Sequence, residues 1–266
     1  MEAVFLDSQV GKVQLRRGGA GPVVVYLHSA QGEGEGLALL DLLADQFDVV
    51  APMFPGYGES EGLDQIDDME DATFHLLDVL DRLEIDRPTV VGVSLGAWMA
   101  AEVATRYPQR AGGLVLVNPA GLYIEGAEIK DIFGRKLSEM IPDLYHDPQH
   151  PMAQLMRQYS EIAADRNADL PFELVKPFLQ TMAATARLAW DPYLHNPKLR
   201  RRLGRITAPT LVVRATGDTL IPEEHARAYA AEIPGATYRE IDDAAHLVMI
   251  EQPAALAGMV TEFVAP

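Results

Sequence analysis

Three residues around position 94 have the types and the spacing that nucleophilic chemistry needs. Gly92, Ser94 and Gly96 follow the pattern G-x-S-x-G, directly after the apolar run Thr-Val-Val and before a helix-like run. In that context the serine occupies a sharp strand-to-helix turn, where side chains two residues away would collide. A random match to the pattern is expected only about 0.04 times in a chain of this composition. The motif therefore predicts a nucleophilic hydroxyl at Ser94, above the positive end of a helix dipole.

A serine hydroxyl is a weak nucleophile, so it needs a base and a third group that orients the base. Asp218 follows the apolar run 210–216, at the expected carboxyl end of a strand, and is the predicted orienting acid. The chain has seven histidines, but only His246 combines the right chain order with a place after the last strand-like run. The order serine, acid, histidine is typical of this serine motif. We therefore predict Ser94, Asp218 and His246 as nucleophile, acid and base.

Acyl transfer also needs hydrogen-bond donors for the oxyanion that forms. The backbone N–H of Leu95, which directly follows the nucleophile, is the first predicted donor. The loop after the apolar run 23–28 is predicted to supply the second donor, from the N–H of Ala30. His28, at the start of that loop, is expected to brace the loop rather than to act in catalysis.

These residues need a scaffold of strands and helices, and the hydrophobic pattern predicts one. Short apolar runs rich in β-branched residues alternate with helical patterns, and four runs are almost continuously apolar, as in strands buried on both faces of a parallel sheet. The sequence thus predicts an α/β fold with right-handed crossovers, preceded by a hairpin that turns near Gly11. The predicted strands are 23–28, 47–52, 89–94, 113–119, 210–216 and 237–241, and the predicted helices are 68–84, 95–106, 223–232 and 253–264.

The alternation of strands and helices stops between about residues 121 and 205. This stretch holds helix-like pieces separated by prolines (127–140, 151–164 and 172–188) and has no convincing strand. At about 85 residues it is far longer than a usual strand-to-helix connection. We predict that residues 1–120 and 206–266 form the core domain, and that residues 121–205 form a helical cap over the strand ends.

Taken together, the chain resembles the α/β-hydrolase superfamily, and in particular capped serine hydrolases similar to carboxylesterases and meta-cleavage-product hydrolases. The residues that carry the resemblance, besides the motif at Ser94, are the hairpin, the loop after His28, Pro55–Ser60, Asn118–Gly121, Gly217-Asp218 and the region of His246. The resemblance implies a mostly parallel α/β-hydrolase sheet with helices on both faces and a helical cap insertion. It also implies the same three catalytic roles.

The chain departs from the family pattern in the loops around the predicted site. Ser29 stands where the oxyanion loop usually has Gly, Met53 where an Asp is common, and Ala245 where Gly often precedes the histidine. Leu247 follows His246, whereas many ring-cleavage hydrolases carry Trp at that place. That last departure weakens the case for a ring-cleavage substrate.

The oxyanion loop, the histidine loop and the predicted cap supply candidates for a substrate pocket. Pockets for small molecules are lined largely by apolar and aromatic groups with a few polar ones. The residues predicted to bind substrate are His28, Ser29, Tyr145, Arg187, Trp190 and Leu247.

The composition excludes several classes of function. The chain has 22 Lys and Arg against 39 Asp and Glu, and its net charge of −17 disfavours nucleic acid and anionic membranes as partners. The absence of cysteine excludes disulfides and a cysteine nucleophile. We expect no signal peptide and no transmembrane segment. We therefore expect a cytoplasmic enzyme with no metal and no organic cofactor, whose partner is a small-molecule ester.

Three functions are consistent with these residues. The first is hydrolysis of carboxylic esters of small to medium size through an acyl-enzyme intermediate. The second is C–C bond hydrolysis of meta-cleavage-type diketones by the same three residues. The third is a non-catalytic small-molecule receptor on the same fold, although a receptor has no need of an intact trio. A dehalogenase or epoxide hydrolase with an Asp nucleophile is disfavoured because position 94 is Ser.

Overall fold

The computed structural model describes residues 1–164 and 172–265, and its centre is an eight-stranded sheet. The strands lie in the order β1-β2-β4-β3-β5-β6-β7-β8. β2 runs antiparallel to β1 and β4, and the other neighbours pair in parallel, which confirms the predicted α/β fold with a mostly parallel sheet. The strands are β1 (Glu2–Asp7), β2 (Lys12–Gly18), β3 (Val23–Leu27), β4 (Asp48–Pro52), β5 (Thr89–Val93), β6 (Gly113–Val117), β7 (Thr210–Ala215) and β8 (Thr237–Ile241).

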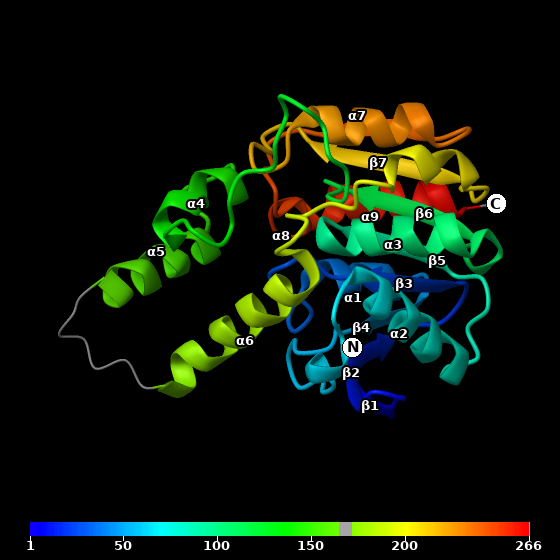
Figure 1. Cartoon of the computed structure of the whole chain (residues 1–266), viewed down its shortest axis with the longest axis horizontal. Helices are drawn as coiled ribbons and strands as arrows, with labels where there is room; N and C mark the ends of the chain where they lie inside the picture. The colour runs from blue at the N-terminus through cyan, green and yellow to red at the C-terminus, as the bar shows by residue number, and fades with distance from the viewer. Residues whose placement is uncertain (165–171, 266) are drawn as a thin grey trace.

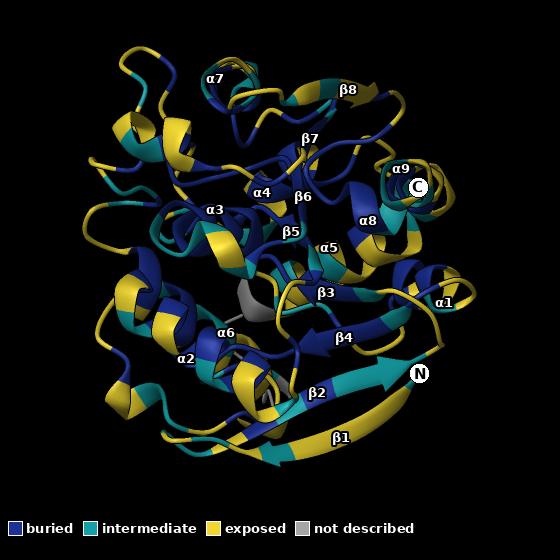
Figure 2. Cartoon of the chain, turned by 90° about the vertical axis from the view of Figure 1, so that its right-hand side faces the viewer, coloured by how far each residue is buried: buried dark blue, intermediate teal, exposed yellow. Residues whose placement is uncertain are grey.

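The central strands are apolar on both faces because helices cover both faces of the sheet. Every residue of β6 is buried, and β3, β4 and β5 are buried except at their first residue. Figure 2 shows α2, α3 and α7 on one face and α1, α8 and α9 on the other. These helices are α1 (Ala38–Ala44), α2 (Met69–Arg82), α3 (Leu95–Arg106), α7 (Glu223–Glu232), α8 (Val248–Glu251) and α9 (Pro253–Val264).

The register of the parallel strands brings the predicted site loops to one edge of the sheet. Leu27 of β3 pairs with Gly92 of β5, and Val93 of β5 pairs with Val117 of β6. The segments that begin at His28, Ser94 and Asn118 therefore leave the sheet at neighbouring points. The carboxyl edge of such a sheet is where α/β sites assemble.

Two helices of the core were not predicted from the sequence, α1 and the four-residue α8. α1 carries Leu39, Leu40 and Leu43, which are buried, and it connects the parallel neighbours β3 and β4. A run of only seven residues is short for a helical period to be recognised, which is why the pattern was missed.

None of the described helices combines the length and the apolarity that crossing a bilayer requires.

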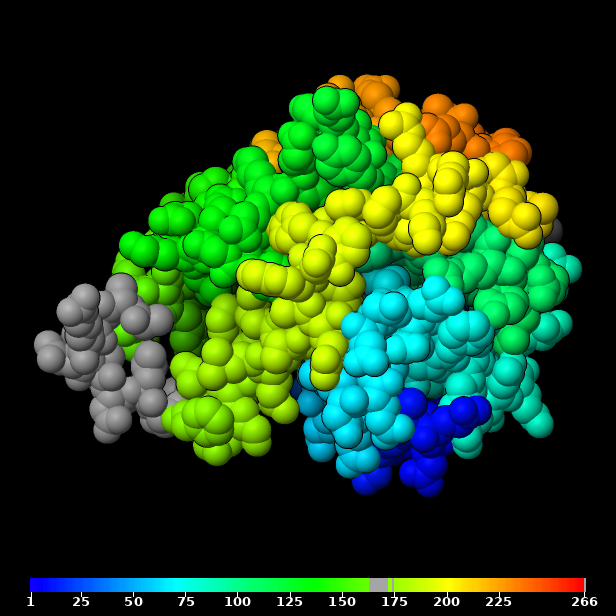
Figure 3. Space-filling view, in the orientation of Figure 1, coloured from blue at the N-terminus to red at the C-terminus, as the bar shows by residue number. Residues whose placement is uncertain are grey.

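Among the described residues, the stretch between β6 and β7 holds three α-helices, which Figure 1 shows extending to one side of the sheet. In Figure 3 the surface of this stretch lies on the same side of the molecule. The three helices are α4 (Leu137–Leu144), α5 (Pro151–Ala164) and α6 (Phe172–Ala189). The helix predicted over 127–140 is wrong in its first part. There the Asp131 side chain accepts hydrogen bonds from the N–H groups of Phe133 and Gly134, which stabilises a turn in place of a helix. Residues 165–171 lie outside the described residues, and the limits of a cap at 121 and 205 stay a prediction.

Candidate active site

Ser94 lies on the turn between β5 and α3, as the sequence motif predicts. Its backbone has φ 54° and ψ −109°, which a residue other than glycine rarely adopts. The turn leaves no room for side chains at its flanking glycines. A Cβ atom on Gly92 would clash with the backbone of Gly96, and a Cβ atom on Gly96 would clash with the carbonyl oxygen of Leu27. The elbow is anchored to the sheet because the N–H of Ser94 donates to the Val117 oxygen at 2.9 Å.

The three predicted catalytic side chains form one hydrogen-bonded chain. Oγ of Ser94 lies 3.0 Å from Nε2 of His246, and Nδ1 of His246 lies 2.8 Å from Oδ2 of Asp218. All three residues are buried, at 5%, 3% and 3% exposure for Ser94, His246 and Asp218. An ionised carboxylate only accepts hydrogen bonds, so Asp218 favours the proton on Nδ1 and leaves Nε2 free to accept the serine proton. The arrangement is suited to activating an alcohol with an oriented imidazole.

The acid and the histidine are each held by neighbours on the strand ends. Oδ1 of Asp218 accepts the N–H groups of Leu220 at 2.9 Å and Ile221 at 3.0 Å. Asn118, directly after β6, donates from Nδ2 to the carbonyl oxygen of His246 at 3.0 Å, and its Oδ1 accepts the N–H of Ala215 at 2.9 Å. Asn118 therefore ties the end of β7 to the histidine loop. We predicted no role for it from the sequence, although a polar residue directly after a buried strand is a usable signal.

The loop that carries the predicted second oxyanion donor lies beside the nucleophile. The first turn of α3 packs so closely on the end of β3 that Gly96 touches the carbonyl groups of Leu27 and His28. Among the described residues, the N–H groups of Ala30 and Leu95 donate to no other protein group. Both groups are therefore available to an oxyanion formed at Ser94.

His28 and Ser29, which we predicted to bind substrate, have their polar groups engaged inside the protein. The N–H of Phe54 donates to Nε2 of His28 at 3.0 Å, so Nδ1 carries the proton and donates to the Ser29 oxygen at 2.7 Å. Burial lowers the pKa of His28 and keeps the ring neutral. The Ser29 hydroxyl donates to Glu33 at 2.7 Å. The polar groups of both side chains are thus occupied by protein partners, and a role for either residue in substrate binding stays a prediction.

Tyr145 and Leu247 lie beside the loops of the site. The Tyr145 ring is buried and stacks on His150 with ring centroids 5.4 Å apart. Burial, together with the charges of Glu251 and Glu33, raises the pKa of its phenol to about 12. Leu247 is buried, and its N–H donates to the Leu144 oxygen at the end of α4 at 3.0 Å. It fills the core next to His246, which is a packing role.

Arg187 and Trp190 are not brought to the triad. The guanidinium of Arg187 lies 3.8 Å from the carboxylate of Asp67 and is half-exposed. Trp190 is 63% exposed and packs on Phe133 with ring centroids 5.2 Å apart. The contacts given for these two residues are with residues outside the triad, and their role in substrate binding stays a prediction.

The end of α4 is hydrogen-bonded to the loop of Asp218 and to the loop of His246, which the sequence did not reveal. Asp143 accepts hydrogen bonds from Lys130 and from Thr219, each at 2.5 Å, and forms an ion pair with Arg135 at 2.7 Å. Its own carbonyl oxygen accepts the N–H of His246 at 3.3 Å. Asp143 thus contacts Thr219, which directly follows the predicted acid Asp218, and it also contacts the predicted base His246.

A second carboxylate joins the same two segments. Glu251 of α8 accepts hydrogen bonds from the N–H groups of Ala245 at 2.8 Å, His146 at 3.1 Å and Asp147 at 3.0 Å. Glu251 therefore links the segment after α4 to the loop that holds His246.

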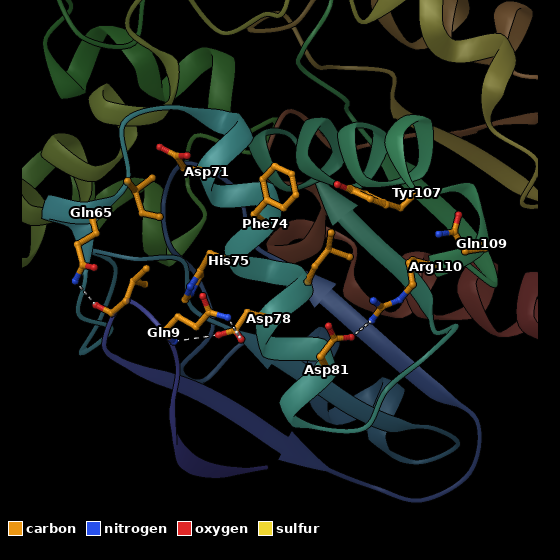
Figure 4. A pocket seen from close by; sticks show the side chains of 13 residues that line it. Gln9, Gln65, Asp71, Phe74, His75, Asp78, Asp81, Tyr107, Gln109 and Arg110 are labelled. Carbon is orange, nitrogen blue, oxygen red and sulfur yellow. Dashed lines mark hydrogen bonds and ion pairs between the residues drawn. The ribbon is translucent and has the colours of Figure 1, made fainter.

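A separate groove of about 480 Å³ runs along α2 and contains none of the predicted site residues. Figure 4 shows its lining side chains, which come from α2, from the segment before α2 that holds Gln65 and Ile66, from the β1–β2 turn and from the segment after α3. Within it, Asp78 binds Gln9 and Arg82, and Asp81 pairs with Arg110 at 2.7 Å. The charged groups of the groove are thus largely paired with one another.

The chain is similar in sequence and in fold to known proteins. The chain is 26% identical to the biotin biosynthesis bifunctional protein of Teredinibacter turnerae over 91% of its own length, but spans only 44% of that protein. It is 25% identical to 2-hydroxy-6-oxo-6-phenylhexa-2,4-dienoate hydrolase of Burkholderia cepacia, covering 96% of the chain and 91% of that protein. The solved structure of the hydrolase of that name from Rhodococcus superposes with a TM-score of 0.76 at 20% identity, covering 98% of each chain.

A family model described as the alpha/beta hydrolase family matches residues 21–259, from the start of the parallel sheet into the last helix. That range includes the elbow at Ser94, the acid loop and the histidine loop. The match, the sheet order and the hydrogen-bonded trio agree with one another. The chain therefore belongs to the alpha/beta hydrolase family.

Proposed function

We propose that this protein is a serine hydrolase that cleaves carboxylic esters of small to medium size through an acyl-enzyme. The observation that carries the proposal is the unbroken chain of hydrogen bonds from Ser94 through His246 to Asp218. Oγ of Ser94 attacks the ester carbonyl while Nε2 of His246 takes its proton. The N–H groups of Ala30 and Leu95 hold the oxyanion. His246 then protonates the leaving alcohol and activates the water that releases the acid.

The choice of an ester rests on the positions of three cations of the insertion, Lys130, Arg135 and Arg187. The dienoate hydrolases among the relatives are named for substrates that carry a carboxylate. A buried carboxylate is best bound by a free cationic side chain. Here Lys130 and Arg135 are both paired with Asp143, and Arg187 faces Asp67 at the surface. A neutral acyl substrate needs no such cation.

C–C bond hydrolysis of meta-cleavage-type diketones is the second candidate. Relatives that cover most of the chain favour it, including a 2-hydroxymuconate semialdehyde hydrolase of a Pseudomonas strain at 28% identity over 96% of the chain. The same three side chains would serve that reaction. A panel of neutral p-nitrophenyl esters and a 2-hydroxy-6-oxo-dienoate, assayed with one preparation, separates the two. Preferred turnover of the dienoate would overturn the ester proposal.

The direct test of the proposed chemistry is Ser94→Ala. We expect turnover of p-nitrophenyl acetate to fall by about 10³-fold or more, because the nucleophile is lost, while the thermal unfolding midpoint stays close to wild type. Ser138→Ala, at an exposed position of α4, is the matched control and should leave turnover unchanged. Unchanged hydrolysis in Ser94→Ala would refute the assignment of Ser94 as the nucleophile. A wild-type protein that binds esters without cleaving them would refute the proposal and favour a receptor.

A further inference from the structure

The oxyanion loop is organised around the carboxylate of Glu33. Oε1 accepts the N–H of Ser29 and the phenol of Tyr26, each at 2.7 Å, and Oε2 accepts the Ser29 hydroxyl at 2.7 Å. The same hydroxyl accepts the N–H of Gln31 at 3.1 Å. Ser29, where the family usually has glycine, therefore uses its side chain to close the loop on Glu33.

The direction of the Ala30 N–H is fixed through the carbonyl of Ser29. These two groups belong to one planar trans peptide unit, so they point in opposite directions. The Ser29 oxygen accepts two hydrogen bonds, from Nδ1 of His28 at 2.7 Å and from the N–H of Gly32 at 3.1 Å. Glu33 accepts the N–H and the hydroxyl of Ser29, so the residue before Ala30 is restrained at its N–H, its side chain and its carbonyl oxygen. The Ala30 N–H is left to point away from these partners.

The loop is also held from the insertion. Thr185 of α6 is buried, and its hydroxyl lies 3.2 Å from the Ala30 carbonyl oxygen, 2.8 Å from the Thr181 oxygen and 2.7 Å from the hydroxyl of Tyr57. Because the hydroxyl has one proton for two carbonyl oxygens, the restraint on the Ala30 carbonyl is weaker than the one on the Ser29 carbonyl. A loop restrained in this way needs little reorganisation when charge develops, which is what an oxyanion hole requires.

We propose that Glu33 is the positioning residue of the oxyanion hole: through Ser29 it sets the orientation of the Ala30 N–H toward the tetrahedral intermediate formed at Ser94. The inference rests on the proposed function and assigns a role to a side chain outside the triad. A carboxylate suits this task because both of its oxygens only accept, and all of the groups directed at them are donors. An amide at position 33 would turn an NH₂ group toward one of those donors.

Phosphonylation of Ser94 by a fluorophosphonate tests the role, because it uses the oxyanion hole whatever the natural substrate is. In Glu33→Gln we expect the second-order rate of labelling to fall by about 10- to 100-fold. The affinity for phenylboronic acid, which adds to Ser94 as a tetrahedral anion, should fall by a similar factor. KM for p-nitrophenyl acetate should stay within about twofold, since ground-state binding does not need the oxyanion donor.

Two variants that leave the carboxylate in place guard against simple misfolding. Ser29→Ala removes the hydroxyl donor but keeps the N–H, and Tyr26→Phe removes the phenol donor alone. We expect both to slow labelling less than Glu33→Gln does, with Ser29→Ala the slower of the two. Glu35→Gln is the matched control, because its carboxylate is 89% exposed, and it should label like wild type.

The outcomes separate this inference from the proposed function. A folded Glu33→Gln that labels within about twofold of wild type, or equal loss of labelling in Glu35→Gln, would overturn the role of Glu33 while leaving the serine hydrolase intact. If Glu33→Gln does not fold, unchanged labelling in both Ser29→Ala and Tyr26→Phe would overturn it equally. A folded wild-type protein that is not labelled at Ser94 would refute the proposed function first, and this inference with it.

Discussion

The loops at the carboxyl edge of the sheet and the outer helices of the insertion are built in opposite ways. In the loops, the polar groups of Ser29, Asn118, Asp218 and His246 each have a protein partner. On α5 and α6, large apolar side chains are exposed to solvent, namely Met152, Leu155, Tyr159, Ile162, Phe172, Phe178 and Leu179. The comparison shows that side-chain hydrogen bonds are concentrated in the loops that hold the predicted site. The far end of the insertion, by contrast, is poor in packing partners among the described residues.

The largest effect on turnover should come from replacing the proposed catalytic acid, Asp218. In Asp218→Asn the amide can donate to Nδ1 of His246 and so favour the wrong tautomer, which leaves Nε2 unable to accept the serine proton. We expect kcat for p-nitrophenyl acetate to fall by about 10⁴-fold with little change in KM. Steady-state kinetics on both proteins measures this. Asp242→Asn, at an exposed position nearby, is the control, and a loss in it as large as in Asp218→Asn would contradict the assignment.

A smaller effect is expected where the insertion meets the loops, at Asp143. Burial by itself raises the pKa of this carboxyl, but hydrogen bonds from Lys130, Thr219 and Arg135 outweigh burial and hold the pKa below its ordinary value. The interaction therefore stabilises the folded protein above pH of about 4 and is lost as the pH falls through the lowered pKa. Asp143→Asn should lower the free energy of unfolding at pH 7 by about 3 kcal/mol, because it leaves two cations without their partner.

Urea unfolding at pH 7 and at pH 3 measures the effect. The gap in unfolding free energy between wild type and Asp143→Asn should narrow at the lower pH, because at pH 3 the Asp143 carboxyl of the unfolded wild-type chain is largely protonated and the folded state no longer gains the full benefit of its lowered pKa. Asp86→Asn, whose side chain is 85% exposed, is the control and should show no such gap. A gap that widens on acidification would contradict the lowered pKa. We also expect kcat of Asp143→Asn to fall about tenfold, since its neighbours include both catalytic loops.

The smallest effects are expected on the outer side of the insertion. Arg187→Ala and Trp190→Ala each remove a solvent-exposed side chain that lies away from the triad. Each should change the free energy of unfolding by no more than about 0.5 kcal/mol and kcat/KM by no more than about twofold. Melting curves and ester kinetics check both numbers. A tenfold rise in KM in either variant would show that substrate reaches this face after all.

The sequence predicted Ser94 and Asp218 because each follows a buried strand, which a continuous apolar run makes recognisable. His246 follows β8, an edge strand that is largely exposed, and was found from the chain order serine, acid, histidine. The sequence indicated that His28 braces its loop, but it did not reveal that the Ser29 hydroxyl bonds to Glu33, because this depends on Glu33 folding back onto it. It also misjudged residues 127–136, where the Asp131 side chain competes locally for the backbone donors. Contacts between segments distant in the chain, such as Asp143 with Thr219, leave no periodic trace.

The central claim is that Ser94 becomes covalently acylated because His246 takes its proton. Mass spectrometry of the protein, quenched in acid during turnover of p-nitrophenyl acetate, tests this most directly. The account predicts a fraction of the wild-type protein heavier by one acetyl group, carried by the peptide that contains Ser94, and no such adduct in His246→Ala. Steady ester turnover with no acylated protein, or with the acetyl group on a different residue, would contradict it.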